Sequence, residues 1–304
     1  MNIIEIIMSA GRVSVDVALY TLLPIMVVML IIMKYLEEKG VLDAIVRLTS
    51  PALKPFGISG MGIFALIQLN FVSFAAPLAA LAIMERRGTS DRHLAATLAM
   101  VFAMGQANVF YPLTPFGLHW GAAIGISLIG GLAASSFTYY LAGRRLSSAT
   151  LRDEEGELSQ EKPRAGLIAV INGAGADAIR LSLGSLPMLL LSLTVVGILK
   201  AAGVVEALTS LLTPLMSFFH ISTVYVLLTL TKCLAGGTAY FGVASEMAQH
   251  GQLTAAQINA SAGFLVQTLD LPGIGIFLGI ASRFVRLFRC LLYTSPSPRD
   301  VEES

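Results

Sequence analysis

Long apolar stretches with few or no charges dominate the pattern of hydrophobic and polar positions along the chain. Four of them are Val15 to Met33, Ile58 to Met84, Leu118 to Ala142 and Leu186 to Leu199. Each is on the scale of the ~20 apolar residues that cross the hydrocarbon core of a bilayer. The pattern therefore predicts an all-α, multi-span helical membrane protein.

The polar and apolar positions of the first half recur in the second half at a constant offset and without a gap. The matches are GVLDA at Gly40 over GVVEA at Gly203, Pro51 over Pro214, Ile58-Ser59 over Ile221-Ser222, Met84 over Met247, and Gly88 over Gly251. A run of matches in one order predicts an internal duplication, which is a common plan for transporters.

A charged segment, SSATLRDEEGELSQEKPR, separates the two halves and reads as a solvated linker. The predicted organisation is a first membrane repeat at 1–146, a linker at 147–165 and a second membrane repeat at 166–289. The last stretch, CLLYTSPSPRD, looks like a translated sequencing-library adapter, so residues 290–304 are predicted to be a non-native tail. The alternative is an ordinary Ser/Pro-rich tail.

Each half is expected to contain an amphipathic entrance and a span, then a short amphipathic segment, a long helix, a short helix and a final span. The long helices are predicted at Ile58 to Met84 and at Ser222 to Gln249. The short helices are predicted to begin at the N-cap residues Asp91 and Thr254, and Thr254 forms a capping box with Gln257.

The short helices leave the topology open. They reach the polar stretches QANVFYPLTP and QTLDLPG after only about 16–17 residues, near 25 Å, whereas the core is ~30 Å thick. If they cross fully with irregular chain, the repeats are parallel and three arginine clusters share one, cytoplasmic side. If they re-enter, the halves can be inverted. The clusters are Arg86-Arg87-Arg92, Arg144-Arg145 and Arg283-Arg286-Arg289.

One apolar stretch, LTLTKCLAGGTAYFG, contains a lysine and then two adjacent glycines. On a helix, Thr229, Lys232 and Gly236 share one face. Gly236 and Gly237 weaken the helix, each by up to about 1 kcal/mol relative to alanine, and the freed backbone must face protein or water. Close helix packing is the alternative use of these glycines.

A charge at membrane depth costs ~2.5 kcal/mol or more, so Lys232 is expected to have a partner. The candidate is Asp270, predicted at the end of the short helix on the face of Gln267. The first half has Leu69 and Ala107 at the aligned positions, so both charges are absent there together. A binding pair, a structural ion pair and a lysine that snorkels to the interface remain alternatives.

The first half offers neutral polar groups near its own break: Gln68, Asn70 and Ser73, and then Gln106, Asn108, Tyr111 and Thr114. Amide side chains and broken-helix termini can bind a solute or satisfy exposed backbone. The predicted substrate-binding residues are Lys232, Asp270, Gln267, Thr229, Gln106, Asn108, Asn70, Gly236 and Gly237.

The sequence lacks the residue patterns that several classes of function require. Two cysteines and four scattered histidines give no metal-ligand spacing, so no metal and no cofactor are expected. The sequence has no Walker loop, dinucleotide fingerprint, HExxH motif or nucleophile triad, so it is predicted not to be an enzyme. A net charge of +1 without a basic patch argues against a nucleic-acid partner.

The duplicated layout resembles the nucleoside-recognition, or Gate, domain family. The resemblance rests on GVLDA…SPALKPFGIS, on GVVEA…TPLMSFFHIS and on TPFG at Thr114 to Gly117. It implies one Gate domain per half. Members of the family include spore maturation proteins A and B, the membrane part of ferrous-iron transporter B and parts of concentrative nucleoside transporters. The chain lacks the GTPase domain of the iron transporter.

The predicted function is a multi-pass transporter or permease of the bacterial inner membrane. It would move a small polar or anionic solute, such as a nucleoside, through a midplane site between the repeats. The alternative is a non-transporting assembly or signalling partner of the spore-maturation type. Expected partners are the solute, the lipid bilayer, and another copy of the chain or a second membrane subunit.

Overall fold

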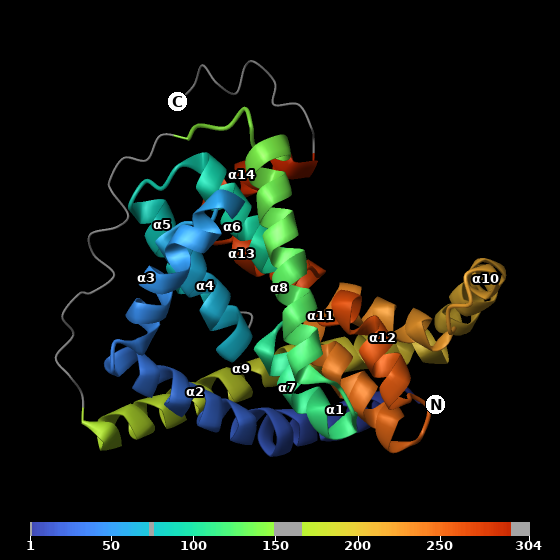
Figure 1. Cartoon of the computed structure of the whole chain (residues 1–304). Coiled ribbons are helices and arrows are strands. Elements are labelled where there is room, and N and C mark those ends of the chain that lie inside the picture. Colours follow the sequence, from blue (N-terminus) through green and yellow to red (C-terminus); the bar gives the residue numbers. More distant parts are fainter. Residues whose placement is uncertain (1, 73–75, 149–165, 293–304) are drawn as a thin grey trace.

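The computed structural model describes residues 2–72, 76–148 and 166–292, and this part of the chain is helical throughout, apart from turns, short extended segments and one isolated bridge (Figure 1). The prediction of a multi-span helical membrane protein with broken helices is confirmed. Most of the predicted linker, all but the first three residues of the predicted tail, and Ser73 lie outside the described residues.

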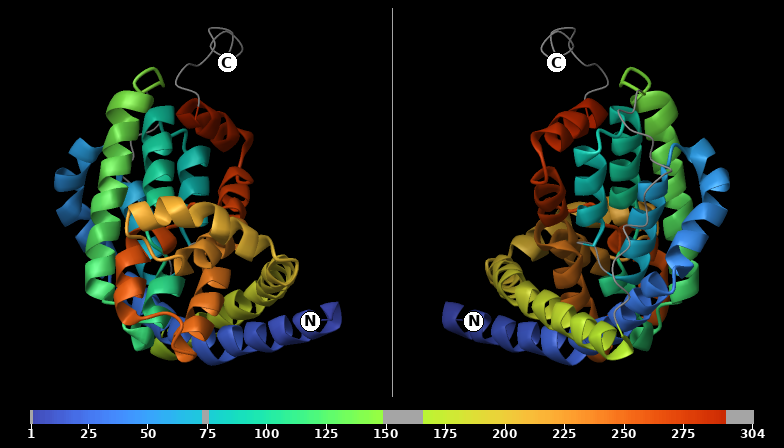
Figure 2. Two further views of the ribbon diagram at one scale, coloured as in Figure 1. Left: turned by 90° about the vertical axis from the view of Figure 1, so that its right-hand side faces the viewer. Right: turned by 90° about the vertical axis from the view of Figure 1, so that its left-hand side faces the viewer.

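Two long helices run side by side along one edge of the molecule (Figures 1 and 2). One is continuous from α1 (Ile3–Val15) through the π-helical η1 (Asp16–Leu22) to α2 (Leu23–Glu38), so the predicted amphipathic entrance and first span form a single helix. The other is α9 (Leu167–Ala201). They are antiparallel, since Gly197 packs against Ile6 near one end and Asp177 pairs with Lys34 near the other.

The first half then folds back on itself. After α3 (Val41–Leu53) and η2 (Lys54–Phe56), the chain forms α4 (Gly60–Phe71) and α5 (Pro77–Arg86). The two ends of this pair meet at one place. Gly57, before α4, packs against the ring of Tyr139, and Arg92, after α5, donates a 2.6 Å hydrogen bond to the carbonyl oxygen of Tyr139. We call residues 60–86 the first hairpin.

The second half repeats this shape with α10 (Val204–Phe218) followed by α11 (Val224–Gln249). By length and composition α11 could cross a membrane. However, the hydroxyl of Tyr225 donates to the carbonyl oxygen of Gln257 at 3.0 Å, which brings the start of α11 beside the first turn of the next helix. The helix bends back at Gly236, and we call residues 224–249 the second hairpin.

Two broken spans follow the hairpins. The first consists of α6 (Asp91–Ala103), α7 (Ala107–Leu113) and η3 (Thr114–Phe116). The second consists of α12 (Ala255–Leu265) and α13 (Leu271–Leu278). The capping box of Thr254 is present as predicted, whereas α6 is capped by Ser90 rather than Asp91.

The final span differs between the halves. In the first half it is a single long helix, α8 (Trp120–Phe137), extended by η4 (Thr138–Ala142). In the second half α13 is followed by a separate α14 (Ser282–Leu292). The helix α14 therefore occupies the place of the final span, and the structure describes it as far as Leu292.

The two broken spans are antiparallel. At one end, Arg283 pairs with Asp91 at 2.6 Å, which joins the end of the second broken span to the start of the first. At the other end, the amide of Asn259 donates to the carbonyl oxygen of Gly117 at 2.7 Å. Matching elements of the two halves therefore run in opposite directions, while their common origin remains a prediction.

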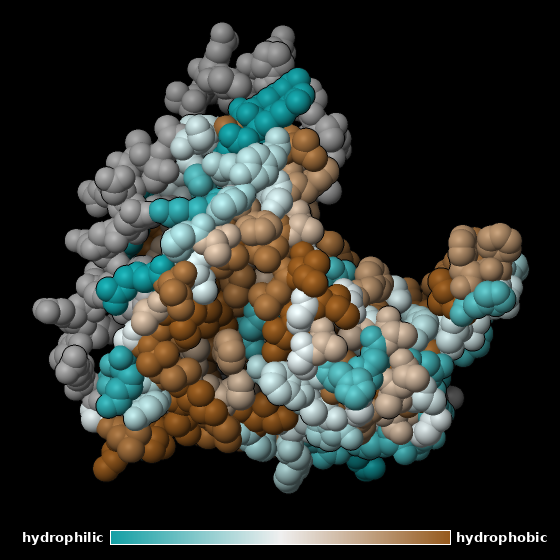
Figure 3. Space-filling model, viewed as in Figure 1, coloured by the Kyte–Doolittle hydropathy of each residue, from teal (hydrophilic) through white to brown (hydrophobic). Residues whose placement is uncertain are grey.

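The surface has the character expected around a bilayer. The face seen in Figure 3 is mainly apolar between α2 and α8, and hydrophilic residues gather at its upper end. Members of two arginine clusters lie beside the segment that carries the third, because Arg92 contacts both Tyr139 and Ser147 while Arg283 contacts Thr89 and Asp91. Four described helices are long and apolar enough to cross a membrane, counting the folded-back α11.

Candidate functional site

The two broken spans cross where each loses its helical conformation. Residues 102–106 and 266–269 lie antiparallel and exchange backbone hydrogen bonds, which run from Gln106 to Val266 (3.0 Å), from Thr268 to Met104 (2.9 Å) and from Leu269 to Phe102 (3.1 Å). Backbone groups freed inside a membrane must find partners within the protein. The backbone groups freed at the two breaks therefore form hydrogen bonds with each other.

The tip of the second hairpin lies on this crossing. Gly236 has φ 87° and ψ 175°, a conformation open mainly to glycine, and it ends the first arm of α11. Gly237 is packed so closely that a Cβ atom there would lie 2.6 Å from Oε1 of Gln106. Both uses proposed for the glycines are therefore met at once: they break the helix and they allow close packing.

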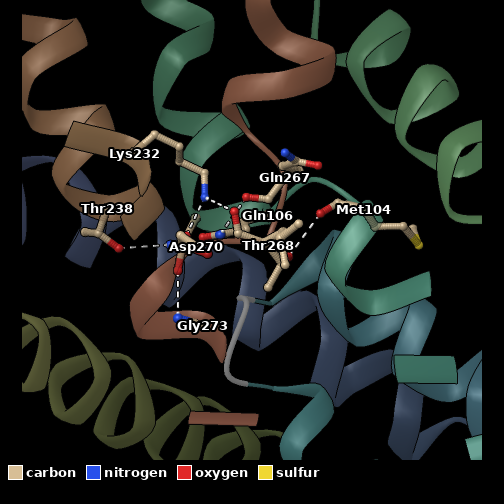
Figure 4. Close-up of polar contacts among 10 residues, drawn as sticks. Met104, Gln106, Lys232, Thr238, Gln267, Thr268, Asp270 and Gly273 are labelled. Atoms are coloured by element: carbon tan, nitrogen blue, oxygen red, sulfur yellow. Dashed lines mark hydrogen bonds and ion pairs between the residues drawn. The ribbon is translucent and has the colours of Figure 1, made fainter. Parts of the chain in front are cut away.

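The predicted contact between Lys232 and Asp270 is present (Figure 4). The Lys232 ammonium donates to Oδ2 of Asp270, and it lies 3.5 Å from the carbonyl oxygen of Leu269. Only 1% of Lys232 and 6% of Asp270 is exposed, so the two charges are removed from solvent together and Lys232 does not snorkel. A buried pair of this kind depends on both partners, because loss of one strands the other.

Asp270 occupies a different local position from the predicted one. The helix α12 ends at Leu265, and Asp270 is the N-cap of α13, where its Oδ1 accepts the backbone N–H of Gly273 at 2.7 Å. The predicted helical face shared by Gln267 and Asp270 is therefore wrong. Residues 266–269 pair with the other broken span instead of continuing the helix.

The amides of the two halves also meet at the crossing. The Gln106 side chain donates to the carbonyl oxygen of Gln267 at 3.1 Å (Figure 4), and Asn108 donates to the hydroxyl of Thr238 at 3.3 Å. The structure thus brings together seven of the nine predicted residues: Lys232, Asp270, Gln267, Gln106, Asn108, Gly236 and Gly237.

The other two predicted residues have no polar contact with the ion pair in the described part of the chain. Thr229 is half-buried on α11, about one turn before Lys232. Asn70 is buried at the end of α4 and donates to the carbonyl oxygen of Leu66 at 2.9 Å. Its Oδ1 and the Oε1 of Gln68 are buried without a hydrogen-bond partner among the described residues.

Three polar groups of the site were not singled out from the sequence. Thr268 is fully buried, and its hydroxyl donates to the Met104 carbonyl oxygen at 3.0 Å. Thr238 accepts the Asn108 amide, and the Leu269 carbonyl oxygen lies near Lys232. One available signal was Asp270 followed by Leu-Pro-Gly, since an aspartate just before a proline often marks the start of a helix.

The site is closed in this conformation. Gln106 is 2% exposed and is as inaccessible as the ion pair. A surface cavity of about 570 Å³ lies at Thr114 to Ala122 and is lined by none of the nine residues. A smaller depression of about 260 Å³ borders Gln267 and Leu269 on the side of α6 and α14. It ends one residue short of Asp270.

Comparison with known proteins gives one family match and two informative structures. Residues 19–116 match the Gate family, described as nucleoside recognition, so the predicted resemblance is confirmed for this region. A Gate domain in the second half remains a prediction. Among curated proteins, nothing matches the sequence significantly.

The fold is similar to that of CNTnw, a concentrative nucleoside transporter. A variant of CNTnw in an outward-facing state aligns with TM-score 0.66 and 19% identity, over 91% of this chain and 71% of that one. An inward-facing, substrate-bound state of CNTnw aligns with TM-score 0.64 and 18% identity, over 91% and 70% of the two chains. At this level of identity the likeness concerns the fold.

Proposed function

We propose that the protein is a transporter that moves a small polar solute across a membrane through the crossing of its two broken spans. The Gate match and the fold shared with a concentrative nucleoside transporter support this function. Transport of this kind requires only non-covalent binding of the solute. We propose the bacterial inner membrane as the location of the protein.

One observation carries the proposal: a fully buried lysine–aspartate pair lies where two broken spans and a hairpin tip meet. Ionisable groups inside a membrane protein are expensive to bury and generally mark a pathway or binding site. Discontinuous helices at a repeat interface are the usual place for such a site in transporters.

The second hairpin is the part of this arrangement that we propose to move. The second hairpin touches the crossing through its tip, where Gly236 lies 3.4–3.6 Å, measured from an added Cβ, from Pro272 and the Asp270 oxygens. Lys232 lies on the arm before this tip. Withdrawal of the hairpin would uncover Gln106 and separate Lys232 from Asp270. The closed conformation is then one state of an alternating-access transporter.

The full burial of the same residues also favours a second candidate, a non-transporting assembly partner of the spore-maturation type. In that case the crossing is a permanently packed core. The two candidates differ in whether the hairpin tip ever becomes accessible to water.

Cysteine labelling distinguishes them. Cys233 and Cys290 are replaced, and a single cysteine is placed at Thr238, beside the tip. A membrane-impermeant maleimide is applied to oriented vesicles from each side in turn. A transporter predicts labelling from both sides, whereas a control cysteine at Ala244, which is fully buried within the same hairpin, stays unlabelled. Protection of Thr238→Cys from both sides would contradict transport and favour the packed core.

A further inference from the structure

The two charges of the ion pair are not equally supported by their surroundings. Asp270 has two independent partners: Lys232 on Oδ2, and the Gly273 N–H on Oδ1 at 2.7 Å. It also sits at the N-terminus of α13, where the helix dipole favours a negative charge. Asp270 would remain stabilised if Lys232 moved away.

Within the described part of the chain, Lys232 has no second partner comparable to Asp270. Besides Asp270, its ammonium lies near the carbonyl oxygen of Leu269 at 3.5 Å, the outer limit of a hydrogen bond. Its side chain is 1% exposed, so bulk solvent does not reach the ammonium in the closed state. When the pair separates, the lysine is therefore the group that needs a replacement partner.

The groups around the hairpin tip are neutral and cannot take that place. The closest side chains to Gly236 and Gly237, apart from Asp270, are Pro272 and the Gln106 amide. The neighbouring contact between Asn108 and Thr238 is also neutral. A neutral solute at this site would hydrogen-bond to the Gln106 amide but leave the ammonium uncompensated.

We propose that the transported solute carries a carboxylate, and that this carboxylate replaces Asp270 on the Lys232 ammonium when the second hairpin opens. One lysine balances one negative charge, so a small organic monoanion is favoured over a phosphate ester of higher charge. This inference rests on the proposed transport function and specifies the solute class of the same site.

Chemical rescue tests the inference without knowledge of the natural solute. Asp270→Ser removes the internal carboxylate, leaves room beside Lys232, and keeps an N-cap residue for α13. Sodium acetate should raise the melting temperature of this purified variant, with an apparent affinity about ten-fold or more above that for acetamide. In the double variant Lys232→Met/Asp270→Ser, acetate and acetamide should act alike. An equal response of Asp270→Ser to both molecules would overturn the proposal.

The unaltered protein provides a second test that does not depend on the folding of a variant. Orotate and uracil, nicotinate and nicotinamide, and benzoate and benzamide are compared as matched acid and neutral probes by calorimetric titration. Tighter binding of the acids is expected, and tighter binding of the neutral members would refute the carboxylate class. If Thr238→Cys is accessible from both sides but neutral probes bind better, transport stands and only the solute class fails. If Thr238→Cys is protected, the transport function itself fails.

Discussion

The two hairpins have the same shape and different chemistry. In the first half, the position aligned with Lys232 is Leu69 of the first hairpin, which is fully buried, and the position aligned with Asp270 is Ala107 of the first broken span. Both hairpins nevertheless fold back and bring their ends together. The architecture therefore does not require a charge, and the ion pair of the second half is an addition that needs its own explanation.

The hairpins also turn in different ways. In the first, α4 ends at Phe71 and α5 begins with Pro77 as its first residue. The second turns at one non-helical residue, Gly236, within an otherwise continuous helix. The second arm of the first hairpin thus starts with a proline, which suits the first helical position, whereas the second hairpin turns at a glycine with positive φ.

An all-or-none result is expected from labelling the ends of the hairpins. Because the broken spans are antiparallel, cysteines at Arg86 and at Gln252, next to the two loops that precede them, should react from opposite sides of the membrane. The aligned glycines of these loops, Gly88 and Gly251, both have φ of 69°, which disfavours a side chain. The cysteines are therefore placed at their exposed neighbours, Arg86 and Gln252. Labelling of both cysteines from one side would contradict the inverted arrangement.

The largest change in stability is expected from breaking the charged pair of the second half. Lys232→Met and Asp270→Leu should each destabilise the protein by roughly 3–5 kcal/mol, because the remaining charge is stranded in the interior. The double variant should recover much of this loss. Melting in detergent measures the cycle, and coupling appears as a departure from additivity.

The first hairpin supplies the matched control for this cycle. Leu69→Met conserves volume at the aligned position and should change stability by less than about 1.5 kcal/mol. Additive losses for Lys232→Met and Asp270→Leu would show that the pair does not couple the hairpin to the second broken span.

A smaller effect is expected at the tip of the second hairpin. Gly237→Ala places a Cβ atom 2.6 Å from the Gln106 amide, so the amide must shift and weaken its bond to the Gln267 carbonyl oxygen. Overpacking of this kind typically costs about 1–3 kcal/mol. Gly175→Ala on α9 has open space and should be neutral or slightly stabilising by thermal melting. Equal melting temperatures for the two variants would show that the tip is not tightly packed.

The smallest effect is expected at the neutral site of the first half. The Asn70 amide nitrogen bonds only within its own helix, to Leu66, and its Oδ1 has no partner among the described residues. Asn70→Leu should therefore change the melting temperature little, by the equivalent of about 1 kcal/mol or less. A loss as large as that of Lys232→Met would mean that both hairpins carry equally important polar groups.

The sequence was sufficient to predict the membrane class, the break at Gly236 and the contact between Lys232 and Asp270. These predictions depend on local properties: apolar length, glycine in a helix, and the cost of an unpaired charge. The re-entrant fold of α11 could not be predicted, because its 26 residues are as long as a true span. The non-helical conformation of Gly236 and the contact of Tyr225 with Gln257 show that it turns back.

The prediction of where Asp270 lies was wrong for a related reason. Helical periodicity predicts a helix through residues 266–269, whereas the chain leaves the helix there and pairs with residues 102–106 of the other half. A pairing between segments so far apart leaves no local pattern in either of them. Asp270 followed by Leu-Pro-Gly was a local signal for the start of a helix, but the helical periodicity of the preceding residues predicted the end of one.

The most direct test of a solute site at the crossing is calorimetric titration of the matched acids and neutral probes into the folded double variant Lys232→Met/Asp270→Leu. The double variant keeps the fold while removing both charges from the second hairpin and its broken span. The account predicts that the acids lose their advantage over the neutral probes in this variant. Retention of the same preference for acids as in the unaltered protein would show that the ion pair is purely structural and that the site lies elsewhere.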